Sequence, residues 1–294
     1  MVKKKSRLGE DLQPRIREMR FSIHLLKQNP LVILGFAIAA LMMFTAVFAP
    51  WIAPYGAEER FWQANLQPPS WQHLFGTDEI GGDIFSRVVW ATRVDLGLAL
   101  LVVLGIEVTA VLVGSISGYL GGKIDEVLMR VTDMLLAFPG LILAMAVAAA
   151  LGRNLTNLAI ALMIVGWPGD ARLVRGVILG ERSKLYVEAA RSVGAGRPRI
   201  IFLHVLPNAI YPLLVSATLG LGGTILAFAG LSFLGFGAGS GAAEWGYMIS
   251  LGRNYLYASP WVATFPGLAI FFTVMGFNLV GDGLRDVLDP RLRR

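Results

Sequence analysis

Long apolar runs constrain this chain more than any other feature of its sequence. The first, Leu31–Ala53, is long enough to cross a hydrocarbon core of roughly 30 Å, which takes about 20 apolar residues. Hydrophobic residues make up 55% of the 294 positions and charged residues only 16%, whereas soluble domains average about 25% charged. The sequence therefore predicts an all-α, polytopic membrane protein.

Six spanning segments are expected, and two of them contain helix-breaking residues. Pro139-Gly140 predicts a kink in the third, and Trp167-Pro168-Gly169 interrupts the fourth, which we expect to be kinked, buried and extended into the cytosol. The first is predicted to be an uncleaved anchor, because its apolar run is longer than that of a signal peptide. The expected spans are Leu31–Ala53, Leu96–Tyr119, Met129–Leu151, a fourth from Leu155, Ala209–Phe236 and Trp261–Leu279.

Basic residues are unevenly divided by this topology. Of the 26 Lys and Arg residues, 21 fall on the side of the termini and 5 on the other, which predicts cytoplasmic termini by the positive-inside rule. The net charge of +6 thus indicates membrane orientation, and no nucleic acid partner is expected.

Residues 11–28 fit an amphipathic helix on the inner leaflet or a disordered basic tail. The predicted divisions are a basic cytosolic segment (1–30), an anchor (31–53), an external segment (54–94), a five-helix core (95–284) and a cytosolic tail (285–294).

A basic insertion, residues 184–208, interrupts the core on the cytosolic side; we call it the docking loop. Good helix formers from Leu185 to Val193 predict a short helix, which Gly194 would end by taking the left-handed conformation. Pro198 can occupy the first turn of a second helix, where its missing N–H costs nothing. Two adjacent alanines and a glycine corner let another backbone approach closely, so the loop is interpreted as a docking piece for a partner protein. The alternative is an ordinary amphipathic loop.

The docking loop also carries a recognisable pattern. Glu188-Ala189-Ala190, three residues, Gly194 and then Leu206-Pro207 resemble the "EAA" loop of ATP-binding-cassette importer permeases. His204 stands where that family's general pattern has Ile. His-x-Leu-Pro-Asn is similar to the dipeptide, oligopeptide and nickel branch, so the departure points to that branch.

Three further segments resemble the same branch. Residues 73–87, which run HLFGTDEIGGDIFSR, follow its external pattern, except that Gly82 replaces the usual Arg. Glu244-Trp245-Gly246 and the ending Asn278–Pro290 follow it as well. Asp78, Glu79 and Asp83 loosely suggest a calcium loop, but their spacing is not that of an EF-hand.

The resemblance implies a type I importer permease fold with a cytosolic coupling helix, in the inner (cytoplasmic) membrane. It also implies a heterodimer with a second homologous permease subunit, two ATPase subunits that bind ATP and Mg²⁺, and an external substrate-binding protein. Di- or oligopeptides are the expected cargo, with nickel or another small solute left open. The residues implied in ATPase docking are Leu185, Tyr186, Glu188, Ala189, Ala190, Arg191, Gly194, Ala195, His204 and Pro207.

Catalytic and cofactor-binding patterns are absent from the sequence. It has no GxxxxGK[ST] loop, no HExxH, no GxSxG and no cysteine, so we expect no enzyme activity, cofactor or metal in this chain. Glu107, near the middle of the second span, should face protein or a water-filled path because a central charge costs about 2.5–3.5 kcal/mol on insertion scales. Glu107 and Asp133 are candidates for a translocation path. A structural hydrogen bond for Glu107 and an ion-coupled secondary transporter remain the alternatives.

Overall fold

The structure, a computed structural model, describes residues 29–237, 239 and 241–288. Within these ranges the chain is nearly all helical and contains no strand, only an isolated antiparallel bridge between Thr77 and Asp83. The predicted all-α class is confirmed. The expectation for residues 11–28 lies outside the described residues. The elements are α2 (Pro30–Ile52), α3 (Ile84–Leu120), α4 (Gly122–Leu136), α5 (Gly140–Leu151), α6 (Leu155–Arg182), α7 (Leu185–Ser192), α8 (Arg197–Arg199), the π-helix η1 (Ile200–Val205), α9 (Leu206–Phe233), α10 (Trp245–Gly252), the 3₁₀-helix η2 (Arg253–Tyr255) and α11 (Trp261–Leu288).

Four of these helices, α2, α3, α9 and α11, are long and apolar enough to span a membrane. The bent pair α4 and α5 makes a fifth if it is counted as one span. α6 has 28 residues but does not reach the same apolarity, because Asp170, Arg172 and Arg175 lie in its second half. Length and composition therefore support four or five of the six predicted spans.

The third predicted span differs most from expectation. Instead of one kinked helix from Met129, two helices meet at 91°, and the first of them already begins at Gly122. Pro139 has ψ of 119°, well outside the helical range. Its ring also disfavours a helical conformation at the preceding residue, so the chain turns there rather than bending gently.

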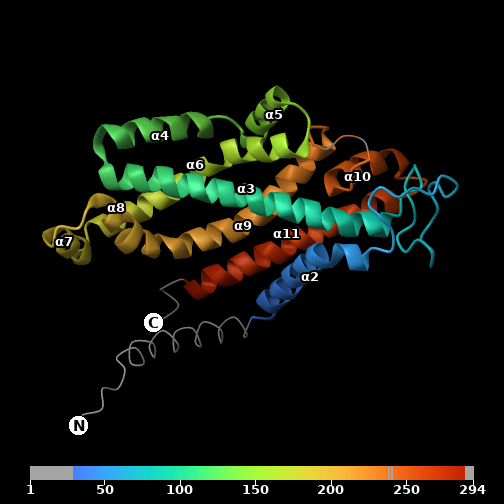
Figure 1. Cartoon of the computed structure of the whole chain (residues 1–294), viewed down its shortest axis with the longest axis horizontal. Helices are drawn as coiled ribbons and strands as arrows, with labels where there is room; N and C mark the ends of the chain where they lie inside the picture. The colour runs from blue at the N-terminus through green and yellow to red at the C-terminus, as the bar shows by residue number, and fades with distance from the viewer. Residues whose placement is uncertain (1–28, 238, 240, 289–294) are drawn as a thin grey trace, which may run out of the picture.

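α3 and α6 pack along much of their length (Figure 1). Two glycines of α3 make this possible, since a Cβ on Gly114 would lie 2.5 Å from the carbonyl oxygen of Ala171 and one on Gly118 would lie 3.0 Å from that of Arg175. Small residues let membrane helices approach closely, and close packing drives their association in lipid. α7 and α8 lie at one end of the bundle, and α10 and residues 54–83 lie at the opposite end (Figure 1).

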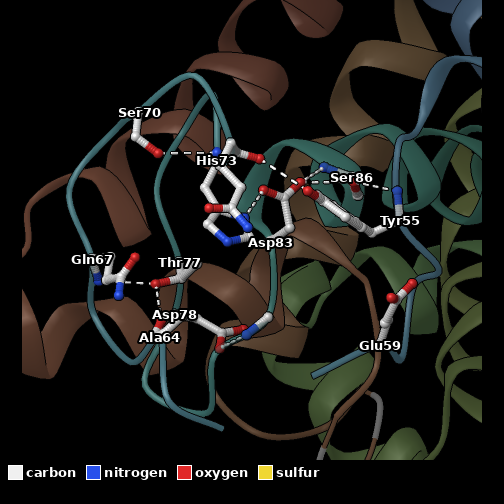
Figure 2. Close-up of polar contacts among 12 residues, drawn as sticks. Tyr55, Glu59, Ala64, Gln67, Ser70, His73, Thr77, Asp78, Asp83 and Ser86 are labelled. Atoms are coloured by element: carbon white, nitrogen blue, oxygen red, sulfur yellow. Dashed lines mark hydrogen bonds and ion pairs between the residues drawn. The ribbon is translucent and has the colours of Figure 1, made fainter. Parts of the chain in front are cut away.

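The end of the bundle opposite α7 is organised by the start of α3, which comes twelve residues earlier than predicted. Asp83 caps this helix, as its Oδ2 accepts from the Ser86 backbone N–H (2.8 Å) and hydroxyl (2.7 Å). Its Oδ1 lies 2.9 Å from His73 Nδ1, as Figure 2 shows. Buried Asp78 pairs with buried Arg87. The carboxylates at Asp78 and Asp83 thus serve the fold, and among the described residues no group of three His, Asp or Glu side chains could hold a metal ion.

A helix not predicted from the sequence, α10, covers the same end of the bundle. Glu244 caps it by accepting from the N–H groups of Gly246 (2.7 Å) and Tyr247 (2.8 Å). Trp245 is fully buried, and its indole N–H donates to the Val88 carbonyl of α3 (3.2 Å). Arg87 donates to the Ala242 carbonyl (3.1 Å), so α3 is joined by polar contacts to α10 and to the segment that precedes it.

Candidate functional site

The docking loop begins with α7, whose end is set by Gly194. This glycine has φ of +80°. Its N–H donates to the Arg191 carbonyl (2.9 Å), and the Ala195 N–H donates to the Ala190 carbonyl (3.1 Å). These two bonds form a Schellman motif, which satisfies carbonyls that the helix end would otherwise leave free. The predicted stop at Gly194 therefore rests on its left-handed conformation.

α7 is anchored along one face only. Val187 is fully buried against an apolar cluster that contains Tyr119, Val174 and Ile200. Ala190 and Ala195 pack at the edge of that cluster. The anchored face fixes the helix to the ends of α3 and α6 and leaves its other face to solvent.

The opposite face carries the small and apolar groups expected of a docking surface. Glu188 and Ala189 are exposed. The Leu185 and Val193 side chains are 81% and 84% exposed. Phe202 and Leu203 of η1 are exposed too. Exposed apolar side chains on one face of a helix are a feature of protein–protein contact surfaces.

Tyr186 connects three helices through its hydroxyl. It donates to Glu181 Oε2 of α6 (2.6 Å) and accepts from Asn208 Nδ2 of α9 (3.0 Å). The Lys184 ammonium also lies 2.5 Å from Glu181 Oε1. Burial, together with the hydrogen bond and charge of Glu181, raises the pKa of Tyr186 to about 12. α7 is therefore linked to both of the long helices that flank the docking loop.

A second link runs to the end of α3. The Arg191 guanidinium lies 5.5 Å from the centre of the Tyr119 ring, within range of a cation–π contact. Arg182 donates to the Tyr119 carbonyl (3.2 Å). α7 thus contacts the bundle through α3, α6 and α9.

The second half of the docking loop returns the chain to the bundle. Pro198 lies in the first turn of α8, as predicted, and η1 continues directly into α9. His204 is exposed, and its carbonyl accepts from Asn208 Nδ2 (3.0 Å). Pro207 is exposed in the first turn of α9. His204 and Pro207 therefore lie near the Tyr186 contacts rather than on the exposed face of α7.

The two predicted path residues lie in different surroundings. Glu107 of α3 lines a cavity of about 310 Å³ between α3, α5, α6 and α9. Asp133 of α4 is exposed and pairs with Arg172 of α6. Arg130, three residues before Asp133 on α4, contacts Glu126 (2.9 Å). The structure brings Glu107 together with Asp170, which the sequence reading had not placed in a path.

Sequence reasoning missed several residues that hold the docking loop in place. Glu181, Asn208 and Tyr119 were not singled out, although each contacts a residue of α7. Only Asn208 had a local signal, since it follows directly after the Leu-Pro of the motif. Glu181 and Tyr119 gave no local signal, because their contacts with α7 form only when the chain folds.

The sequence of this bundle of apolar helices matches the model of a known family. The chain belongs to the binding-protein-dependent transport system inner membrane components, whose family model matches residues 110–294. The N-terminal transmembrane domain of oligopeptide transport permease C matches residues 22–69. The chain is therefore a multi-pass inner-membrane permease.

Individual relatives cover almost the whole chain. A dipeptide transport system permease protein of Alkalihalophilus pseudofirmus is 41% identical over 97% of this chain and 93% of its own length. A probable D,D-dipeptide transport system permease protein of Escherichia coli K12 is 44% identical over 92% and 90%. A glutathione transport system permease protein of an E. coli O6:K15:H31 strain is 44% identical over 86% and 84%.

Proposed function

We propose that this chain is one permease subunit of an ATP-driven importer of di- or oligopeptides, with both termini in the cytoplasm. It forms half of the translocation path, and separate subunits bind ATP and Mg²⁺ and hydrolyse ATP. The relatives named for dipeptide and glutathione transport support this class of cargo. The single observation that carries the proposal is α7, which is fixed on one face and open on the other.

Coupling follows from how α7 is attached. The ATPase subunits dock on the exposed face around Leu185, Glu188 and Ala189, so that their closure on ATP pushes the helix. Because Val187 and Tyr186 bind α7 to the ends of α3, α6 and α9, the push passes to the bundle instead of unfolding the docking loop. The path then opens alternately to the two sides of the membrane.

Three further partners complete the proposal. A second, homologous permease subunit supplies the other half of the path, and a second ATPase subunit docks on it. An external substrate-binding protein delivers the peptide to the end of the bundle that carries α10 and residues 54–83. The positive-inside distribution of Lys and Arg supports this orientation.

The proposal is tested at Ala189, which is exposed and therefore unimportant for folding of α7. Ala189→Trp should abolish the ATPase activity that the loaded binding protein stimulates in the reconstituted complex, because the indole keeps the ATPase subunit away. Ala189→Ser adds a single oxygen and should retain most of that activity. Membrane insertion of both variants is checked in isolated membranes. Full stimulation in Ala189→Trp, or uptake by the chain without ATPase subunits, would show the proposal to be wrong.

A further inference from the structure

A partly open cavity lies in the bundle, lined by residues outside the docking loop. The cavity of about 310 Å³ between α3, α5, α6 and α9 has walls that are mostly apolar or glycine. A Cβ on Gly220 or Gly223 of α9 would meet no atom within 4 Å, so these glycines leave room rather than pack closely. Sites for small molecules start at about 300 Å³ and have this kind of apolar wall with few polar groups.

Two carboxylates are the charged groups of this cavity. Glu107 comes from α3 and Asp170 from α6, and no basic side chain lines the cavity in the part of the chain that the structure describes. The Ser216 hydroxyl donates to Asp170 Oδ1 (2.5 Å). Glu107 Oε2, in contrast, is a buried atom without a hydrogen-bond partner among the described residues. A buried carboxylate oxygen without a hydrogen-bond donor is unfavourable. A cationic donor placed in the cavity would therefore pair with Glu107 Oε2 and stabilise it.

We infer that this cavity binds the terminal ammonium group of a peptide in transit, with Glu107 as its main acceptor and Asp170 as the second. An ammonium group is compact and brings three N–H donors, which two carboxylates can accept. Every unmodified linear peptide carries this group whatever its side chains, so an otherwise apolar and roomy site would suit many sequences. The inference rests on the proposed import of peptides and deepens it.

A divalent metal fits the same cavity poorly. Calcium takes six to eight oxygen ligands, and magnesium demands octahedral oxygen geometry. The cavity offers two carboxylates and the Thr224 hydroxyl among apolar groups, and no set of three His, Asp or Glu residues converges in the described part of the chain. Asp133 does not line the cavity, and its carboxylate is engaged by Arg172.

The complete transporter in proteoliposomes, with its binding protein saturated by radiolabelled dialanine, tests the inference. The measured quantity is the amount of peptide accumulated per ATP hydrolysed, so that differences in capture by the binding protein do not enter. Glu107→Gln should lower this ratio about tenfold, because one charge-assisted hydrogen bond is lost. Asp170→Asn should lower it less. The control Glu126→Gln removes an exposed carboxylate on α4 and should leave the ratio unchanged.

A second measurement addresses the ammonium group directly. A dipeptide with a diazirine side chain is crosslinked to the assembled transporter, and labelled segments of α3 and α6 are found by mass spectrometry. Free dialanine should compete with labelling, and N-acetyl-dialanine should not. A normal ratio in Glu107→Gln, or equal competition by the acetylated peptide, overturns the inference. If instead loaded binding protein fails to stimulate ATP hydrolysis with the unaltered chain, the proposed function itself is wrong.

Discussion

The Tyr186 hydroxyl offers a direct measure of how firmly α7 is attached. Tyr186→Phe keeps the ring and its packing but removes the donor to Glu181 and the acceptor for Asn208. The change removes only the hydroxyl, which bonds Glu181 and Asn208; the exposed side chains of Leu185, Glu188 and Ala189 stay as they are. Any effect must come from the link between α7 and its neighbours.

The expected cost is modest. A hydrogen bond to a charged group contributes about 1.5–3 kcal/mol and a neutral one about 1 kcal/mol. Part of this is offset, because Glu181 keeps the Lys184 ammonium at 2.5 Å and water reaches the half-exposed site. A net loss of about 1–2 kcal/mol in the local stability of α7 is expected, which corresponds to roughly 5–30-fold more frequent opening.

Hydrogen exchange of the protein in lipid nanodiscs measures this opening. The amides of α7 should exchange roughly 5–30-fold faster in Tyr186→Phe, and those of α10 should not change. Tyr257→Phe is the matched control, since Tyr257 is fully exposed and lies between α10 and α11. Unchanged protection of α7 in Tyr186→Phe would refute the reasoning and leave Val187 as the anchor.

Three further changes test other parts of the structure. Gly194→Ala meets no steric obstacle but places a Cβ at φ of +80°, so it should destabilise α7 by about 1–2 kcal/mol and lower stimulated ATPase activity; normal exchange of α7 would contradict this. Burial raises the pKa of Glu244 above its usual 4.5, so the stability that the protonated group contributes is full below that value and is lost as the pH rises through the raised pKa. Glu244→Gln should remove this part of the pH dependence in the exchange of α10, and an unchanged pH profile would count against it. Gly246→Ala would bring a Cβ to 2.3 Å from the Ala229 carbonyl and should lower the melting temperature by an amount equal to about 1–3 kcal/mol; a normal melting temperature would show that α9 yields easily.

Local signals in the sequence were sufficient to predict α7, the first helix of the docking loop. Its predicted bounds, Leu185–Val193, differ by one residue from those of α7, because Gly194 ends a helix through its own conformation. The start of α3 was missed, although Asp83 and Ser86 form a capping pair. Ile84, Val88 and Ala91 recur at helical spacing and are buried, but they were assigned to a polar external segment, so their period was overlooked.

Contacts between distant segments could not be predicted in this way. Asn208 reaches Tyr186 across 22 positions, and Asp170 meets Glu107 only because α3 and α6 pack together. α10 was missed for the same reason, as Trp245 finds its place against α3 rather than by a local pattern. Residue types and spacing predicted a short helix with an exposed face at residues 185–193, but not the side chains that support it from within.

α3 has a mechanical consequence for the whole molecule. With 37 residues it is about 55 Å long, well beyond the roughly 30 Å of a hydrocarbon core. Its last turn touches Arg191 through Tyr119, and its first turns hold Trp245 through Val88. Because α3 is one continuous helix, a tilt imposed at its α7 end also moves its α10 end, so the two ends of the bundle move together.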